Sequence, residues 1–503
     1  MSDSSAYASL QDRFRRRALI GDALGILDWD QATTMPEGSA DGRAEQIATL
    51  SVMRHELVVS PEISDGIARA KQDFAASDTD DWHRGNLREM ERAHALAVAV
   101  PGDLVEAAAR ANAVCELKWR RARAEKDYPS LLPALREVLN LVRQTADARA
   151  EALSLAPYDA LLEEYEAGTR KDQLDPLFDR LASFLPEFLP QVLERQNARP
   201  SPVRPEGPFP IADQRALAAE LMQALGFDFE RGRLDISHHP FCGGATGDVR
   251  ITTRYNADDF TESLMGVLHE TGHALYESGL PRDWQFQPVG NALGMAIHES
   301  QSLLIEMQVS RSRPFLRHAL PRMQSAFGGS GVAWDVDNIY RLYTRVAPGF
   351  IRVDADEVTY PLHIILRYRL EQAMLSGDLD LADLPGAWND AMRELLGITP
   401  PDNRLGCLQD IHWPSGSFGY FPTYTLGAMA AAQFYRAARR DMPGLEEDIA
   451  AGDLAPLVAW LRTHVHGQGS CHTADALLSR ATGEPLNPEI FLAHLEARYL
   501  GDS

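Results

Sequence analysis

The architecture of this chain is decided by one stretch near its middle, Asp259-Phe260-Thr261-Glu262-Ser263-Leu264-Met265-Gly266-Val267-Leu268-His269-Glu270-Thr271-Gly272-His273. Asp259 and Glu262 have the spacing of a capping box, and Gly279 followed by Pro281 is a typical helix stop. These signals predict a helix over residues 259–278 that carries the pattern His-Glu-x-x-His.

This pattern, at residues 269–273, predicts a metal site. Residues four apart lie on one face of a helix, so His269 and His273 can bind the same cation. Glu270 is turned about 100° from His269 by the helical period, and it can act as a general base on the attacking water. A pattern of five residues also occurs by chance on exposed helices, so the site needs further support.

The third metal ligand is expected farther along the chain. A catalytic zinc takes three protein ligands and keeps one position open. We predict Glu299, because a loop containing proline and glycine separates its helix from the first, and such a hairpin returns a carboxylate to the histidines. Glu277 competes, but it stands about 6 Å along the axis from His273, which suits a role in orienting a ligand. His298 also competes, but neighbouring residues point to different sides of a helix, so only one of His298 and Glu299 can face the metal.

The composition is that of a large folded protein. The 503 residues include 49 Lys and Arg against 72 Asp and Glu, and the net charge of −23 disfavours nucleic acid and anionic membranes as partners. No export signal and no transmembrane stretch is found, so a cytoplasmic location is expected. Free thiols are expected for the four widely spaced cysteines, Cys115, Cys242, Cys407 and Cys471.

Helical periodicity dominates the chain, and a mainly α fold is predicted. We expect a single domain over residues 1–503, with a helical N-terminal part (1–230) and a part that holds the metal site and groove (231–503). A proline cluster at residues 200–210 is the best linker candidate. A turn-rich loop at residues 238–244 precedes a predicted strand at 248–255, a small β element that could bind an extended substrate through its edge.

Three further polar segments allow both a functional and a structural interpretation. The loop at residues 406–413 and the aromatic run at 420–424 offer a His or Tyr hydroxyl that could stabilise an oxyanion, or they form an ordinary packed loop. Arg352 could bind a substrate carboxylate, with Arg250 and Arg254 as rivals, or it forms a surface ion pair. A solvated loop, rather than a second metal site, is expected for His464, His466, Cys471 and His472.

Six ordered motifs in this chain resemble those of the carboxypeptidase Taq family of metallocarboxypeptidases. They are His239-Pro240-Phe241, Asp248-Val249-Arg250-Ile251-Thr252, the His-Glu-x-x-His pattern at 269–273, His298-Glu299-Ser300-Gln301, the segment 351–357, and the segment 406–413. The resemblance covers nearly the whole chain. One departure is Leu303, where the family commonly carries an arginine.

The resemblance implies a large helical two-lobed fold with a deep active-site groove, a zinc site on the floor of the groove and a small β element beside it. It also implies the release of single residues from the free C-terminus of peptides, with broad side-chain tolerance and poor cleavage next to proline. Zinc is the expected metal and cobalt the alternative. A homodimer is the expected assembly.

The family's functional residues carry over motif by motif. The resemblance makes His269, His273 and Glu299 the metal ligands and Glu270 the base. It also assigns His412 and Tyr420 to the reacting carbonyl. Arg352 would anchor the substrate carboxylate, and we add His239 and Arg250, each from a motif of its own, as further substrate-binding candidates.

Two other functions are compatible with the pattern of residues. A zinc oligopeptidase that cuts internally uses the same His-Glu-x-x-His and downstream glutamate. A non-catalytic protein could use zinc only for structure or to bind peptides, but a structural site needs no base such as Glu270.

Overall fold

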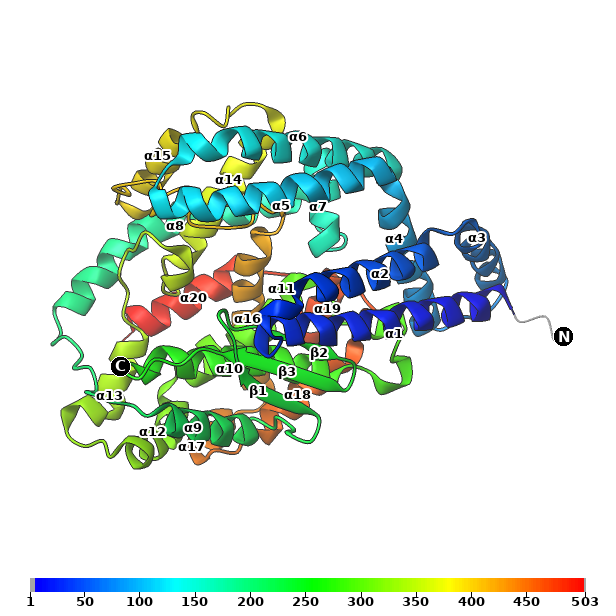
Figure 1. The fold of residues 1–503 in the computed structure, drawn as a ribbon. Helices are drawn as coiled ribbons and strands as arrows, with labels where there is room; N and C mark the ends of the chain where they lie inside the picture. The colour runs from blue at the N-terminus through cyan, green and yellow to red at the C-terminus, as the bar shows by residue number, and fades with distance from the viewer. Residues whose placement is uncertain (1–4, 502–503) are drawn as a thin grey trace.

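The computed structural model describes residues 5–501, and it is mainly helical with one small sheet (Figure 1). The helices of the first half are α1 (Ala6–Thr33), α2 (Ala40–Val59), α3 (Pro61–Ala75), α4 (Asp81–Ala99), α5 (Gly102–Glu125), α6 (Tyr128–Leu153), α7 (Pro157–Tyr165), α8 (Lys171–Asn197) and α9 (Ile211–Ala224). The strands are β1 (Gly232–Ile236), β2 (Cys242–Ala245) and β3 (Asp248–Thr253). The mainly α fold class is confirmed.

The second half is helical almost throughout. Its helices are α10 (Phe260–Gly279), α11 (Gly294–Leu303), the π-helical segment η4 (Leu304–Ser310), α12 (Arg313–Phe327), α13 (Val336–Tyr343), α14 (Tyr360–Ser376), α15 (Leu384–Leu396), α16 (Pro422–Asp441), α17 (Leu445–Ala451), α18 (Ala455–His464), α19 (Ala474–Thr482) and α20 (Pro488–Tyr499). Within residues 5–501, none of the helices has the length and apolar character needed to cross a bilayer.

Two large hydrophobic cores correspond to the two lobes. One core joins side chains of α5, α6, α7 and α8 to those of α14, α15 and α20, the upper part of Figure 1. The other joins α9, α10, α12, α13, α17, α18 and α19, the lower part. Helices α11 and α16 contribute side chains to both cores and therefore lie where the lobes meet.

The small sheet has the strand order β1-β3-β2. β3 pairs in parallel with β1 and antiparallel with β2, and the sheet packs on α10 through Ile251 and Val267. β3 matches the strand predicted at residues 248–255, whereas β2 lies in the predicted turn-rich loop. Because β3 is the central strand, both of its edges are paired, and the prediction that a substrate adds to its edge is wrong.

Helix α10 matches the predicted helix within one residue at each end. Asp259 caps it by accepting a hydrogen bond from the backbone N–H of Thr261 (2.8 Å). Glu262 does not complete a capping box but pairs with Arg254 (3.0 Å). A loop with proline and glycine then leads into α11, which packs against α10 as the predicted hairpin requires.

The thiols and the proline cluster also follow the predictions. All four cysteines are free. The segment between the end of α8 at Asn197 and the start of α9 at Ile211 contains the proline cluster and no helix or strand.

Candidate metal centre

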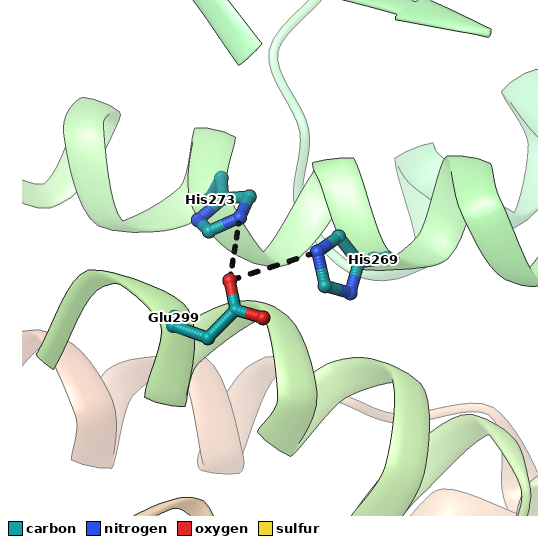
Figure 2. Close-up of side chains that lie close together, drawn as sticks. All are labelled: His269, His273 and Glu299. Atoms are coloured by element: carbon teal, nitrogen blue, oxygen red, sulfur yellow. Dashed lines mark ion pairs between the residues drawn. The ribbon is translucent and has the colours of Figure 1, made fainter. Parts of the chain in front are cut away.

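Three of the predicted residues meet at the α10–α11 hairpin (Figure 2). His269 and His273 project from α10 toward Glu299 on the facing helix α11. The Oε2 atom of Glu299 lies 3.4 Å from Nε2 of His273 and 3.9 Å from Nε2 of His269. Tetrahedral ligands about 2 Å from a zinc ion lie about 3.3 Å from one another, so this donor set fits one cation. Among residues 5–501 it is the one group with the spacing of a metal site.

The second ring nitrogen of each histidine has its own partner. Nδ1 of His269 lies 2.9 Å from Glu306 Oε2, and Arg311 pairs with the other oxygen of Glu306 (2.5 Å). Such carboxylate–histidine contacts fix the ring and its tautomer, which leaves Nε2 for the metal. Glu306 was not predicted from the sequence. It lies in the π-helical segment η4, and its position seven residues after Glu299 is the one feature of the sequence that could have pointed to it.

His273 is oriented by a second histidine. Its Nδ1 lies 2.6 Å from Nδ1 of His298, whose Nε2 lies 2.8 Å from Glu277. Both competitors for the third ligand position therefore lie outside the donor set. Glu277 acts on His273 only through His298, which agrees with the orienting role predicted for it.

Glu270 is buried beside the ligands. Burial raises its pKa from the ordinary value of 4.5 to about 7, against the opposing charge of His269. A carboxyl group with a pKa near neutrality can both accept and release a proton during a reaction. This is the property that a general base needs in amide hydrolysis.

The donor cluster is rich in carboxylates. Burial alone would raise the pKa of Glu299, but the hydrogen bond from His273 and the charge of His269 lower it to about 2. Burial alone would lower the pKa of His269, but the carboxylates of Glu306 and Glu299 raise it to about 10, so a metal that binds Nε2 must displace a proton from this ring. The negative charge that surrounds the histidines is suited to a divalent cation.

Arg352 lies in a buried ion network and not on the surface. Its side chain donates to Asp410 Oδ1 from Nε (3.0 Å) and Nη2 (2.8 Å), and to the Tyr360 hydroxyl from Nη1 (2.8 Å). Arg367 donates to the other oxygen of Asp410. Arg352 is 5% exposed, so the interpretation as a surface ion pair is wrong.

His412 and Tyr420 lie together next to this network. The two rings are 5.5 Å apart, and His412 Nε2 lies 3.3 Å from the hydroxyl of Tyr424. Burial lowers the pKa of His412 to about 4, so the ring is neutral at neutral pH. Burial raises the pKa of Tyr420, and the neighbouring Tyr424 and Glu299 raise it further.

The remaining candidates lie apart from the cluster. Arg250 is held by Asp248 (2.5 Å) and lies over the ring of Trp29 on α1, which favours a role in fixing α1 to the sheet. His239 is exposed in the loop between β1 and β2 and contacts the ring of His238. Its substrate-binding role stays a prediction. Neither residue has a contact with the metal ligands among the described interactions.

The late histidines form no second centre in the described part of the chain. His466 is fully buried, and its Nε2 lies 3.0 Å from Gln301 Oε1. Thus His466 is a packed core residue, and Cys471 is buried as well, so the prediction of a solvated loop is wrong for these two residues.

A cavity of about 550 Å³ adjoins the metal centre. His298 and Glu277 form part of its wall, as do strand β2 and the segment after α7. The cavity therefore lies between elements that are far apart in the sequence, and it reaches the candidate centre at His298, which contacts His273.

Comparisons with known proteins identify the family of the chain. The family described as carboxypeptidase Taq (M32) metallopeptidase matches residues 9–499. The chain belongs to the carboxypeptidase Taq family. Thermostable carboxypeptidase 1 of Thermus thermophilus is 38% identical, covering 99% of each chain, and carboxypeptidase 1 of Bacillus subtilis is 33% identical, covering 97% of each. The solved structure of Trypanosoma cruzi metallocarboxypeptidase 1 has a TM-score of 0.96 at 40% identity and covers 98% of this chain and 99% of its own.

The family membership confirms the predicted resemblance. A carboxypeptidase Taq protein is a metallopeptidase, so the chain is a metal-dependent hydrolase of peptides. The His269, His273 and Glu299 cluster is the candidate site for the divalent metal.

Proposed function

We propose that this carboxypeptidase Taq protein uses zinc, with cobalt as the alternative metal, to release single residues from the free C-terminus of peptides. The observation that carries the proposal is the buried carboxyl group of Glu270 beside a donor set for one cation. A structural or purely peptide-binding zinc site needs no such base. Broad side-chain tolerance and poor cleavage next to proline belong to the same proposal.

The proposed reaction assigns separate roles to the metal site, to Glu270, and to Tyr420 with His412. His269, His273 and Glu299 would hold the metal, which when bound would lower the pKa of a water molecule to about 7 and polarise the scissile carbonyl. Glu270 accepts the proton of the attacking water and transfers it to the leaving amine. The hydroxyl of Tyr420 and the neutral ring of His412 stabilise negative charge that develops on the carbonyl oxygen.

Arg352 is the proposed anchor for the C-terminal carboxylate of the substrate. Its guanidinium shares Asp410 with a second arginine, so the buried network has two cations for one carboxylate. A substrate carboxylate would balance this charge. His239 and Arg250 stay weaker candidates for substrate binding, because their contacts lie elsewhere.

A product time course tests the proposal against an internally cutting oligopeptidase. We expect a short free-acid peptide to lose C-terminal residues one at a time, the same peptide with an amidated C-terminus to be cut slowly, and a chelator to stop both. The variant Glu270→Gln should keep its metal and lose turnover by about 10²–10⁴-fold. Equal cleavage of the amidated peptide would rule out the carboxypeptidase, and a near-normal rate for Glu270→Gln would rule out the base.

The homodimer and the cytoplasmic location are further proposals that rest on the resemblance and the composition. Light scattering of the purified protein tests the first, and cell fractionation tests the second. A monomer at micromolar concentration or a secreted protein would contradict them.

A further inference from the structure

Asp410 lies between two arginine side chains. Arg352 donates to its Oδ1 atom, and Arg367 donates to its Oδ2 atom from Nε (2.7 Å). Arg367 is 0% exposed and also donates from Nη1 to the carbonyl oxygen of His363 (2.7 Å). It therefore cannot touch a substrate. Its guanidinium also lies over the neutral ring of Phe421 (5.5 Å), so Asp410 is the charged group through which it can act on Arg352.

The groups around Asp410 do not balance the second arginine. Burial lowers the pKa of His363 to about 3 and that of His412 to about 4, so both rings are neutral. Glu371 lies one helical turn beyond Arg367 and feels its charge, but burial raises the pKa of Glu371 to about 7. Its hydrogen bonds come from three neutral donors, Trp413 Nε1, the Gly419 N–H and the Tyr158 hydroxyl. In direct contact, two guanidinium groups face a single carboxylate.

Helix α14 supplies this polar face in an otherwise apolar setting. Tyr360, His363, Arg367 and Glu371 follow one another at helical spacing, and they point toward Arg352 and the loop that carries His412. The residues between them, Leu362, Ile364, Ile365 and Leu366, are fully buried in the core. Arg367 is paired with Asp410, but a buried ion pair is often no more stabilising than well-packed apolar residues, so its presence in such a core points to a role beyond stability.

We propose that Arg367 is a positioning residue that engages one oxygen of Asp410, so that Arg352 keeps an uncompensated positive charge for the C-terminal carboxylate of the substrate. The inference rests on the proposed role of Arg352. Without Arg367, both oxygens of Asp410 would be available to Arg352 in a bidentate pair, which is the preferred geometry of this ion pair. The charge offered to the substrate would fall from +1 to zero.

Binding to a catalytically inactive protein gives the most direct test. In the full-length Glu270→Gln protein loaded with zinc, the affinity of one fluorescent peptide is measured as the free acid and as the C-terminal amide. Because the two peptides differ only at the C-terminus, the ratio of their affinities measures the contribution of the free carboxylate to binding. We expect Arg367→Gln to lower this ratio about tenfold, and Arg367→Lys, which keeps the charge, to lower it less. In the active enzyme, Arg367→Gln should raise the KM of the free-acid peptide about tenfold and change kcat less than about twofold.

Two variants distinguish this role of Arg367 from one in which it only stabilises the fold. The double variant Arg367→Gln/Asp410→Asn returns the local charge to +1, and it should restore the ratio to within about threefold of the parent. Glu371→Gln on the same face of α14 is the matched control and should leave the ratio within about twofold. Thermal melting shows whether each variant is folded. If Arg367→Gln is unfolded, the affinity ratio of Arg367→Lys is used in its place.

The outcomes distinguish this inference from the proposed function. An unchanged ratio in Arg367→Gln overturns the inference, as does an equal loss for acid and amide that the double variant does not restore. A ratio lowered equally by Glu371→Gln also overturns it, because charge would then not be the cause. If Arg352→Gln leaves the ratio unchanged, the carboxylate anchor itself is wrong, whatever Arg367 does.

Discussion

At the scale of single residues, His269 uses its two ring nitrogens for different partners. Nδ1 lies within hydrogen-bond distance of Glu306, while Nε2 lies on the side of Glu299. Since Glu306 is ionised and is also held by Arg311, it fixes Nδ1 as the protonated nitrogen. The histidine is thereby set in the tautomer and orientation that a metal requires.

The first prediction concerns Glu306. We expect Glu306→Ala to weaken zinc affinity about 10–100-fold, because the ring of His269 loses its orienting acceptor. Glu306→Gln keeps an acceptor oxygen without the charge, and its zinc affinity should lie between those of the parent and of Glu306→Ala. Competition with a chelator of known affinity measures the change. Glu262→Gln, on the exposed first turn of α10, the helix that carries His269, is the control, and equal affinities in all three variants would contradict the prediction.

At the scale of elements, glycines set the distances between the helices of the centre. A Cβ atom on Gly272 would lie 2.4 Å from the carbonyl oxygen of Gln301 on α11. A Cβ atom on Gly427 of α16 would lie 2.8 Å from the Cβ atom of Glu299. Helices α10, α11 and α16 can approach this closely only because both positions lack a side chain.

A pair of alanine substitutions on α10 tests this packing. Gly272→Ala should push α11 away from α10, which moves Glu299 from the histidines and weakens zinc affinity at least tenfold. Gly266→Ala is the matched control, since its Cβ atom would meet nothing within 4 Å. It should stabilise the protein by about 0.5–1 kcal/mol through helix propensity alone. Chelator competition and urea unfolding measure the two effects, and similar behaviour of the variants would contradict the argument.

The N-terminus of α11 is held by a buried acid. Glu166 is 2% exposed and accepts hydrogen bonds from the backbone N–H groups of Met295 and Ala296. Burial raises its pKa from 4.5 to about 8, although both hydrogen bonds and the charge of Arg92 oppose the shift. The carboxyl group is therefore mostly protonated in the folded protein at neutral pH.

This raised pKa predicts how stability changes with pH. A carboxyl whose folded pKa exceeds its unfolded value stabilises the fold fully below pH 4.5, and the contribution is lost as the pH rises toward 8. Glu166→Gln should therefore remove part of the fall in unfolding free energy between pH 5 and pH 8. Urea unfolding across this range measures it, with the exposed Glu164→Gln as control. Parallel pH profiles for Glu166→Gln and the parent would refute the assignment.

The sequence predicts elements with strong local signals and misses those that depend on distant partners. The helix that carries His269 has a cap and a stop, so its bounds are predicted within one residue. β2 reads Cys-Gly-Gly-Ala, which has no strand propensity, and it forms only because β3 pairs with it. The pairing of Arg352 with Asp410 joins residues 58 apart in the chain, and no local pattern reports such a contact.

At the scale of the whole molecule, the metal centre lies where the two lobes meet. The candidate third ligand, Glu299, is on α11, which contributes side chains to both large cores, as α16 also does. These cores contain dozens of buried apolar side chains, in contrast to small zinc domains that fold only with their metal. The helices that position the ligands are therefore stabilised by packing.

Metal removal should consequently abolish activity without unfolding the protein. We expect a chelator to stop peptide hydrolysis while the far-ultraviolet circular dichroism of the helices stays unchanged. The Tm should fall by a few degrees, because a ligand at 100 times its Kd adds only about 2.7 kcal/mol to the folded state. Zinc or cobalt added back should restore turnover, whereas magnesium, which prefers six oxygen ligands, should not. Loss of the helical signal on chelation would mean that the ligands, and not the two cores, hold α10 and α11 together.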